Sequence, residues 1–157
     1  MTLLELLIGL SLAALVMGLA TPTLRQASHA GAVRAAAYEI LTALAATRAG
    51  AVVEGRSASL CPSVAEHCVE AGTLADSWQA FIEVDGRRVP LSSQALPAGV
   101  SLKSSRSPLR FSPNAASAST GTLTICDATA LVPPRAIVVS QTGRARLVEA
   151  AGASCGS

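Results

Sequence analysis

The chain has 157 residues, enough for one domain or for one domain plus a membrane anchor. Half of the residues are apolar and the mean hydropathy is +0.47, yet aromatic residues make up only 3%, which excludes a core built mainly on aromatic side chains. The net charge of +2 divides unevenly, because residues 49–86 hold one base against six acids and residues 87–146 hold eight bases against one acid. This split suggests a side that faces a polyanion, although a solvated surface with segregated charges accounts for the counts equally well.

The first predicted element is an apolar helix at the N-terminus. Residues Leu6–Leu24 carry no charge, and at about 1.5 Å per residue these 19 residues span a bilayer core about 30 Å thick. Pro22 removes one backbone hydrogen bond, so we expect it to kink the helix without necessarily ending it. Glu5 precedes the run, and a carboxylate inside a membrane is costly unless it is paired. We therefore expect Glu5 either to find a partner or to rest at the headgroup boundary.

A second helical segment follows directly. Residues 25–55 are rich in Ala, the strongest helix former. Apolar residues recur in it at steps of three and four, at Val33, Ala37, Ile40, Leu41, Leu44 and Ala51. Gly55 is a plausible stop. The pattern predicts one long helix whose second half packs a single face on the rest of the chain.

The remainder predicts short strands. Clusters of Gly, Pro, Ser and Asp separate seven β-leaning runs, at residues 57–61, 78–84, 99–103, 109–111, 121–126, 136–141 and 144–149. We expect an α+β fold in which a long N-terminal helix, membrane-spanning in its first half, packs on a small antiparallel β-sheet head. The expected segments are a transmembrane or filament-core helix over 1–24, its amphipathic continuation over 25–55, and a β-rich head over 56–157.

The four cysteines are Cys61, Cys68, Cys126 and Cys155. An even number in a small chain with a membrane-targeting start favours two disulfides in an oxidising compartment. Three pairings are possible. We favour Cys61–Cys68, a short local loop, and Cys126–Cys155, which would fasten the C-terminal tail. Neither pair has the close spacing of zinc modules, so a metal site that uses His67 is not expected, and no cofactor is predicted.

The N-terminal residues TLLELLIGLSLAALVMGLATP resemble the N-terminus of type IV pilins and pseudopilins, with Glu5 at the family's glutamate position and Pro22 at its helix-kinking proline. Past the helix, the resemblance is closest to the GspH/FimT group of minor pilins. It is carried by ATRAGAVVEGRSASLC, by Trp78 with Phe81, by LRFSPN and by AIVVSQTGRARL. The resemblance implies a single-pass inner-membrane protein with a periplasmic head, which then joins an extracellular pilus of a Gram-negative bacterium together with other major and minor pilins.

The same resemblance implies how the first residues act. Pilins are made with a short basic leader that ends in Gly, and a prepilin peptidase removes it and methylates the new N-terminus. Glu5 has the family's spacing if Met1 is the mature first residue, where Phe is usual; either the leader has been trimmed from this sequence or the start was placed late. In pilins this glutamate is implied to meet the N-terminal amine of a neighbouring subunit in the filament core. Assembly is therefore the favoured role of Glu5.

The most suggestive motif of the head is GRAR, residues 143–146. On a strand, Arg144 and Arg146 would share one face about 6.6 Å apart, with Ala145 and Leu147 toward the core. Two adjacent guanidiniums after a turn form a rigid fork suited to phosphates. The pattern, which begins at Gly143, resembles the DNA-contacting motif of FimT-type minor pilins that serve natural transformation. A polar outer strand face is the alternative interpretation.

Two functions from different classes follow. His29 and His67 have no acid or nucleophile at a recognisable spacing, so the chain is not expected to be an enzyme. The first hypothesis is a minor type IV pilin that binds extracellular double-stranded DNA without sequence preference. Its expected contacts are Arg144 and Arg146, with Gly143 in the turn and Lys103, Arg106 and Arg110 as an extension, although ordinary solubility is the simpler role for those three. The second is a structural GspH-like pseudopilin of type II secretion, or a pilus-priming subunit, without DNA binding.

Overall fold

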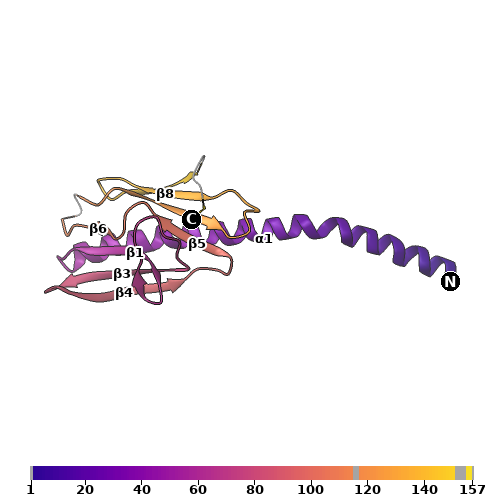
Figure 1. Cartoon of the computed structure of the whole chain (residues 1–157), viewed down its shortest axis with the longest axis horizontal. Coiled ribbons are helices and arrows are strands. Elements are labelled where there is room, and N and C mark those ends of the chain that lie inside the picture. The colour runs from indigo at the N-terminus through magenta and orange to yellow at the C-terminus, as the bar shows by residue number, and fades with distance from the viewer. Residues whose placement is uncertain (1, 115–116, 151–154, 157) are drawn as a thin grey trace.

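The computed structural model describes residues 2–114, 117–150 and 155–156, with residues 13–22 described as backbone only. A single helix, α1 (Leu3–Val53), extends far beyond the head and is continuous through Pro22, as expected (Figure 1). Its N-terminus is closed by a capping box, in which Thr2 accepts from the Glu5 amide and Glu5 accepts from the Thr2 amide. It ends at Val53 with Glu54 as its cap, and Gly55 follows with a left-handed φ of 61°.

The two ends of α1 have different surroundings. Large apolar side chains of Leu3–Leu12 are exposed, Leu3 by 80% and Leu10 by 60%. From Val33 onward one face is buried in the head, through Val33, Ala36, Ala37, Ile40, Ala43, Leu44, Thr47 and Ala51. The predicted stripe is thus confirmed, with Leu41 only half-buried at its margin. Thr23–Val53 is long and apolar enough to cross a membrane by length and composition, but its buried face identifies it as the core helix of the head.

In the described part of the chain, nine strands form two antiparallel sheets. Sheet A has the order β2-β1-β3-β4, and β6 also pairs with β1. Its strands are β1 (Ala58–Val64), β2 (His67–Cys68), β3 (Ser77–Val84), β4 (Arg87–Ala95) and β6 (Leu109–Phe111). Sheet B has the order β5-β7-β8-β9. Its strands are β5 (Val100–Ser104), β7 (Gly121–Asp127), β8 (Arg135–Val139) and β9 (Ala145–Glu149).

The seven predicted runs all overlap observed strands, but β2 and β4 were not predicted. β2 has only two residues. β4 reads RRVPLSSQA, which is polar and contains Pro90, and all of its residues are exposed. A proline is tolerated there because β4 is an edge strand. The predicted α+β fold, a long helix packed on a small antiparallel β head, is confirmed, and the head consists of two sheets.

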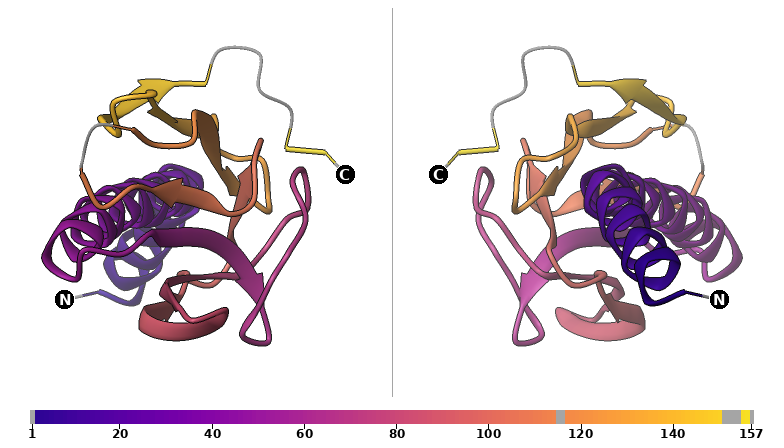
Figure 2. Two further views of the ribbon diagram at one scale, coloured as in Figure 1. Left: turned by 90° about the vertical axis from the view of Figure 1, so that its left-hand side faces the viewer. Right: turned by 90° about the vertical axis from the view of Figure 1, so that its right-hand side faces the viewer.

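The core lies where the two sheets and α1 meet. Viewed along the helix, α1 occupies the angle between sheet A and sheet B (Figure 2). Leu60 and Trp78 come from sheet A, Leu102 and Ile137 from sheet B, and Ile40 from the helix. An isolated bridge between Ala75 and Leu102 also joins the sheets. The head therefore depends on α1 as a structural element, and burying its apolar stripe stabilises both sheets at once.

Two disulfides close the framework. Cys61 is bonded to Cys68, with a sequence separation of 7, and Cys126 to Cys155, with a separation of 29. This is the pairing that the sequence analysis favours. The first fastens the β1–β2 loop of sheet A. The second fastens the C-terminal end of the chain to β7 of sheet B.

Candidate nucleic-acid interface and assembly residues

The turn that leads into β9 is built around Gly143. Its φ is +74°, in the left-handed region that glycine adopts at little cost, and its amide donates to the Ser140 carbonyl at 2.8 Å. A Cβ at this position would lie 3.3 Å from Nε of Arg48 and 3.5 Å from Cβ of Ala118. Glycine is therefore required both by the backbone conformation and by the close approach of α1.

Arg144 and Arg146 are both exposed at the start of β9. Arg144 lies one residue before the strand, so only Arg146 is held by the ladder, opposite Val138. Ala145 and Leu147 pack against the core, as the alternation predicts. Within the described residues neither guanidinium lies within 4.0 Å of a carboxylate. The two arginines thus offer their donors to solvent.

The three other predicted bases are distributed differently. Arg106 is exposed in the loop after β5. Its Cβ would lie 3.6 Å from a Cβ added to Gly121. Gly121 begins β7 and pairs with Val139, so it lies at the end of the sheet next to the β8–β9 turn. Lys103 lies on β5, at the opposite edge of sheet B from β9. Arg110 donates to Glu83 at 2.8 Å. Of the three, only Arg106 lies at the same end of sheet B as the GRAR turn and outside the ion pairs of the described residues.

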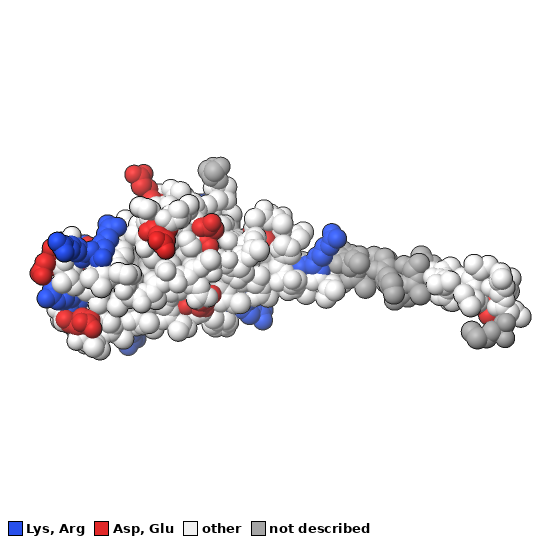
Figure 3. Space-filling model, turned by 90° about the horizontal axis from the view of Figure 1, so that it is seen from below, with Lys and Arg blue, Asp and Glu red and all other residues white. Residues whose placement is uncertain are grey.

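On the face seen in Figure 3, a cluster of basic side chains lies at the end of the head remote from the N-terminus, with acidic side chains among them. Arg56 and Asp85 form one loose pair there, at 3.7 Å between exposed groups. Counting α1 residues from Arg25 to Arg48 places the GRAR turn about 35 Å along the helix from Arg25. The candidate interface therefore lies far from any membrane that holds the first helical turns.

Sequence reasoning missed Arg48. It lies off the apolar stripe of α1, packs under Gly143 and lines a groove of about 630 Å³ together with Arg144. No local motif marks it, because the contact joins residues 95 positions apart. The only sequence signal is that Arg48 is a base on an otherwise uncharged stretch of helix.

His29 has a role that its sequence context did not reveal. Its Nδ1 lies 2.9 Å from Oδ1 of Asp127, whose side chain is 1% exposed. Burial raises the pKa of this carboxyl, but hydrogen bonds from Thr129, His29 and the Leu131 amide outweigh burial and lower the pKa to about 2. The contact clamps the helix to the loop after β7, so its chemistry is structural. Asp127 was the one acid of the basic segment, and nothing in its spacing indicated His29.

The predicted assembly residues lie at the other end of the molecule. Glu5 is exposed, and its carboxylate accepts from the Thr2 amide at 2.9 Å. Met1 lies outside the described residues, and so does the side chain of Pro22. The geometry leaves Glu5 accessible to a neighbouring chain without showing one.

Comparison with known proteins identifies the family of this chain. The family model described as Type II transport protein GspH matches residues 36–143, which is more than half of the chain. The chain belongs to the GspH family. The match begins inside the buried half of α1 and ends at the glycine of the GRAR turn, so it covers sheet A and every strand of sheet B except β9.

Solved structures show the same fold as this GspH-family chain. The type IV minor pilin FimU of Pseudomonas aeruginosa has a TM-score of 0.57 at 21% identity, over 73% of this chain and 91% of that one. The minor pseudopilin EpsH from the type 2 secretion system of Vibrio cholerae has a TM-score of 0.58 at 12% identity, over 75% and 97%. A search of curated protein sequences finds no significant match. Family and fold together support a minor pilin or pseudopilin, and an apolar N-terminal helix fits a membrane-anchored component of that kind.

Proposed function

We propose that this GspH-family protein is a minor type IV pilin that binds extracellular double-stranded DNA, without sequence preference, for natural transformation. The observation that carries the proposal is the pair Arg144 and Arg146. Both are exposed; Arg144 lies just before the edge strand β9 and Arg146 is its second residue. Neither is in an ion pair within the described part of the chain. Exposed arginines without internal partners are free to neutralise phosphates.

The arrangement supports contact with the DNA backbone rather than with bases. Arg146 is fixed by the β8–β9 ladder and Arg144 by a turn in which its amide donates to Oγ of Ser140 at 3.2 Å. Arg106 adds a third base at the same end of sheet B. A row of cations at the end of a strand can follow phosphates, but it presents no helix or strand pair that fits a groove of DNA. Binding is therefore electrostatic and independent of sequence.

Presentation of this surface depends on assembly. We propose that α1 anchors the subunit once in the inner membrane with the head in the periplasm, after a prepilin peptidase has acted. Glu5 then pairs with the N-terminal amine of a neighbouring pilin when the subunit enters the filament. This order suits the distance between the exposed apolar turns Leu3–Leu12 and the GRAR turn, because DNA can contact the head while the helix stays in the filament core.

A binding experiment on the full-length chain in detergent micelles tests the DNA proposal. The double variant Arg144→Gln, Arg146→Gln should weaken binding to every duplex tested and make the log–log salt slope shallower by about 1.8, since each phosphate contact contributes about 0.9. The matched control is the double variant Arg56→Gln, Arg87→Gln, which removes the same charge from two exposed residues. Arg56 lies just before β1, and Arg87 is the first residue of β4. Equal losses of DNA affinity in the two double variants would show that the GRAR turn contributes only through the net charge of the protein.

A second candidate function has specific support. The matching family model is named for type II transport, and EpsH, a pseudopilin of that system, shares the fold. In this alternative the chain is a structural pseudopilin, or a pilus-priming subunit, whose arginines only contact solvent or other subunits. If the full-length chain fails to retard duplex DNA at low salt, this structural role becomes the better description.

A further inference from the structure

A second cavity lies away from the GRAR turn, on the outer face of sheet A. Its volume is about 580 Å³. β3 and β4 form its floor and the β1–β2 loop its rim; the lining is Gln79, Phe81, Arg88, Pro90, Ser93, Glu66, His67 and Cys68. Phe81 alternates along β3 with the core residues Ala80 and Ile82, so its ring lies on the face opposite to α1.

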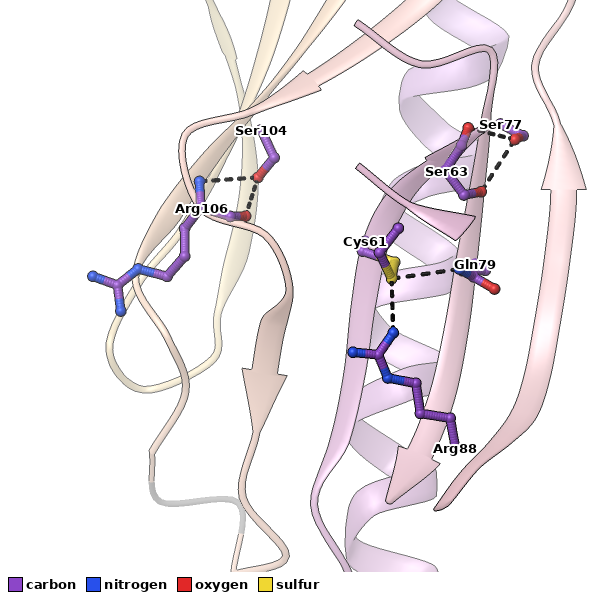
Figure 4. Close-up of a disulfide and its surroundings, with 8 residues drawn as sticks. Cys61, Ser63, Ser77, Gln79, Arg88, Ser104 and Arg106 are labelled. Carbon is purple, nitrogen blue, oxygen red and sulfur yellow. Dashed lines mark hydrogen bonds between the residues drawn. A yellow bond between two sulfur atoms is a disulfide. The ribbon is translucent and has the colours of Figure 1, made fainter. Parts of the chain in front are cut away.

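Arg88 is oriented by this floor. Its Cζ lies 4.8 Å from the centroid of the Phe81 ring, a cation–π distance. One terminal nitrogen of Arg88 points at Sγ of Cys68 at 3.9 Å, and Nε2 of Gln79 donates to the same sulfur at 3.4 Å (Figure 4). A disulfide sulfur is a weak acceptor. Two good donors therefore converge on one point of the cavity without a good acceptor.

The acid opposite Arg88 in the ladder does not supply that acceptor. Glu83 lies opposite Arg88 in the β3–β4 ladder, but its carboxylate is bound by Arg110 at 2.8 Å. Within the described residues no carboxylate lies within 4.0 Å of Arg88. His67 uses Nδ1 in a 2.7 Å contact with the Ala65 carbonyl, which leaves Nε2 for another partner at the rim. The donors that converge on Cys68 thus have no carboxylate partner within the described residues, although Glu66 stands at the rim of the cavity.

We propose that this cavity binds a carboxylate carried by another protein chain, either an Asp or Glu side chain or a C-terminus. The Arg88 guanidinium, which lies over the Phe81 ring, presents a planar fork that fits both oxygens of a carboxylate. Gln79 supplies a further N–H from the adjacent strand, and Pro90 gives an apolar wall for the rest of the incoming residue.

The surroundings favour a single protein carboxylate over a polyanion. Glu66 stands at the rim, and residues 49–86, which supply five of the eight lining residues, carry six acids against one base. A duplex would bring many phosphates close to these acids, whereas one side chain can enter alone. The site is therefore distinct from the GRAR turn, and its test does not depend on DNA binding.

The experiment uses the full-length, isotope-labelled chain in detergent micelles and follows the side-chain resonances of Arg88 and Gln79 by NMR. The probe is the blocked peptide acetyl-Gly-Glu-Gly-amide, and its neutral counterpart carries Gln in place of Glu. We expect saturable shifts with the Glu peptide and none with the Gln peptide. Arg88→Gln should weaken binding at least about tenfold, because a charge-assisted bidentate contact is lost.

Arg87→Gln is the matched control, since it removes the same charge from the neighbouring residue of β4, which does not line the cavity. It should leave the affinity unchanged. Phe81→Leu should weaken binding several-fold while the thermal unfolding curve, recorded for each variant, shows the fold intact. Equal binding of both peptides, or unchanged binding by a folded Arg88→Gln, would overturn the proposal. Tighter binding of inorganic phosphate than of the Glu peptide would also overturn it.

Discussion

Sheet A and sheet B place their charged residues in different environments. Sheet A pairs Arg110 with Glu83 and stacks Arg88 on Phe81, and the nearby Arg56 contacts Asp85. Sheet B buries the carboxylate of Asp127 against His29 of α1, while Arg144 and Arg146 have no ion pair within the described residues. The number of arginines on a surface therefore does not define a binding site; what matters is which of them already have a partner.

The disulfides give the largest expected contrast between the sheets. Replacing Cys126 and Cys155 together by Ala opens a 29-residue loop, worth about 3.6 kcal/mol in the chain-entropy model, against about 2.4 kcal/mol for the 7-residue Cys61–Cys68 loop. Sheet B should thus depend more on its disulfide than sheet A does. Denaturant unfolding of the two double variants checks this order. A larger loss in the Cys61–Cys68 variant would contradict it.

The ion pairs give the next contrast. Asp127→Ala should reduce the free energy of unfolding by about 3 kcal/mol, because the Leu131 amide, Thr129 and His29 lose a buried acceptor. Asp85→Ala, which breaks the exposed pair with Arg56, should cost less than about 1 kcal/mol. Both values come from chemical denaturation near neutral pH. Similar losses would mean that the Asp127 clamp is no stronger than a surface pair.

Asp127 also predicts a pH dependence with a definite sign. Its pKa is lowered from 3.8 to about 2 in the folded protein, so the folded state favours the ionised form. The stabilisation is therefore fully present above about pH 4 and is lost as the pH falls toward 2. Asp127→Asn should flatten this limb of the stability curve. An unchanged acid limb in the variant would assign the loss to other carboxylates.

Two glycines test whether the GRAR turn is held in place. Gly143→Ala should destabilise the protein by about 1–2 kcal/mol, because Ala disfavours a φ of +74° and its Cβ would approach Arg48 to 3.3 Å. Gly31→Ala is the matched control: it lies in α1 with nothing within 4 Å of its Cβ, so it should stabilise by up to about 1 kcal/mol. Thermal unfolding of both variants separates these opposite signs.

The smallest expected effect is the sharpest test of the comparison. Glu83→Gln removes the acid that holds Arg110, so it should raise DNA affinity and steepen the salt slope by about 0.9 if Arg110 then reaches a phosphate. Arg110→Gln in the parent chain should leave the slope unchanged, because that arginine is already paired. A lower slope for Arg110→Gln would show that pairing does not remove an arginine from the interface.

Much of the fold could be predicted because its signals are local. The apolar stripe of α1, the stop at Gly55 and seven strands depend on period and turn residues within short windows. β4 was missed because an exposed edge strand needs neither apolar alternation nor the absence of proline. Arg144 and Arg146 were predicted as contacts from a four-residue motif, and the structure shows that both are exposed. The contacts Arg48–Gly143, His29–Asp127 and Arg110–Glu83 join distant residues, so no local pattern could show which charges are paired.

The continuity of α1 has a mechanical consequence. From Leu3 to Val53 the helix is about 75 Å long, and its last turns lie under the GRAR turn. A pulling force on the end of the head remote from the N-terminus is therefore transmitted along α1 toward its first turns. This force acts parallel to the interface between α1 and the sheets. Under such a load the packed contacts of Val33 to Ala51 and the His29–Asp127 clamp resist in shear, all together rather than one after another. A head fastened in this way is suited to being pulled along its helix axis.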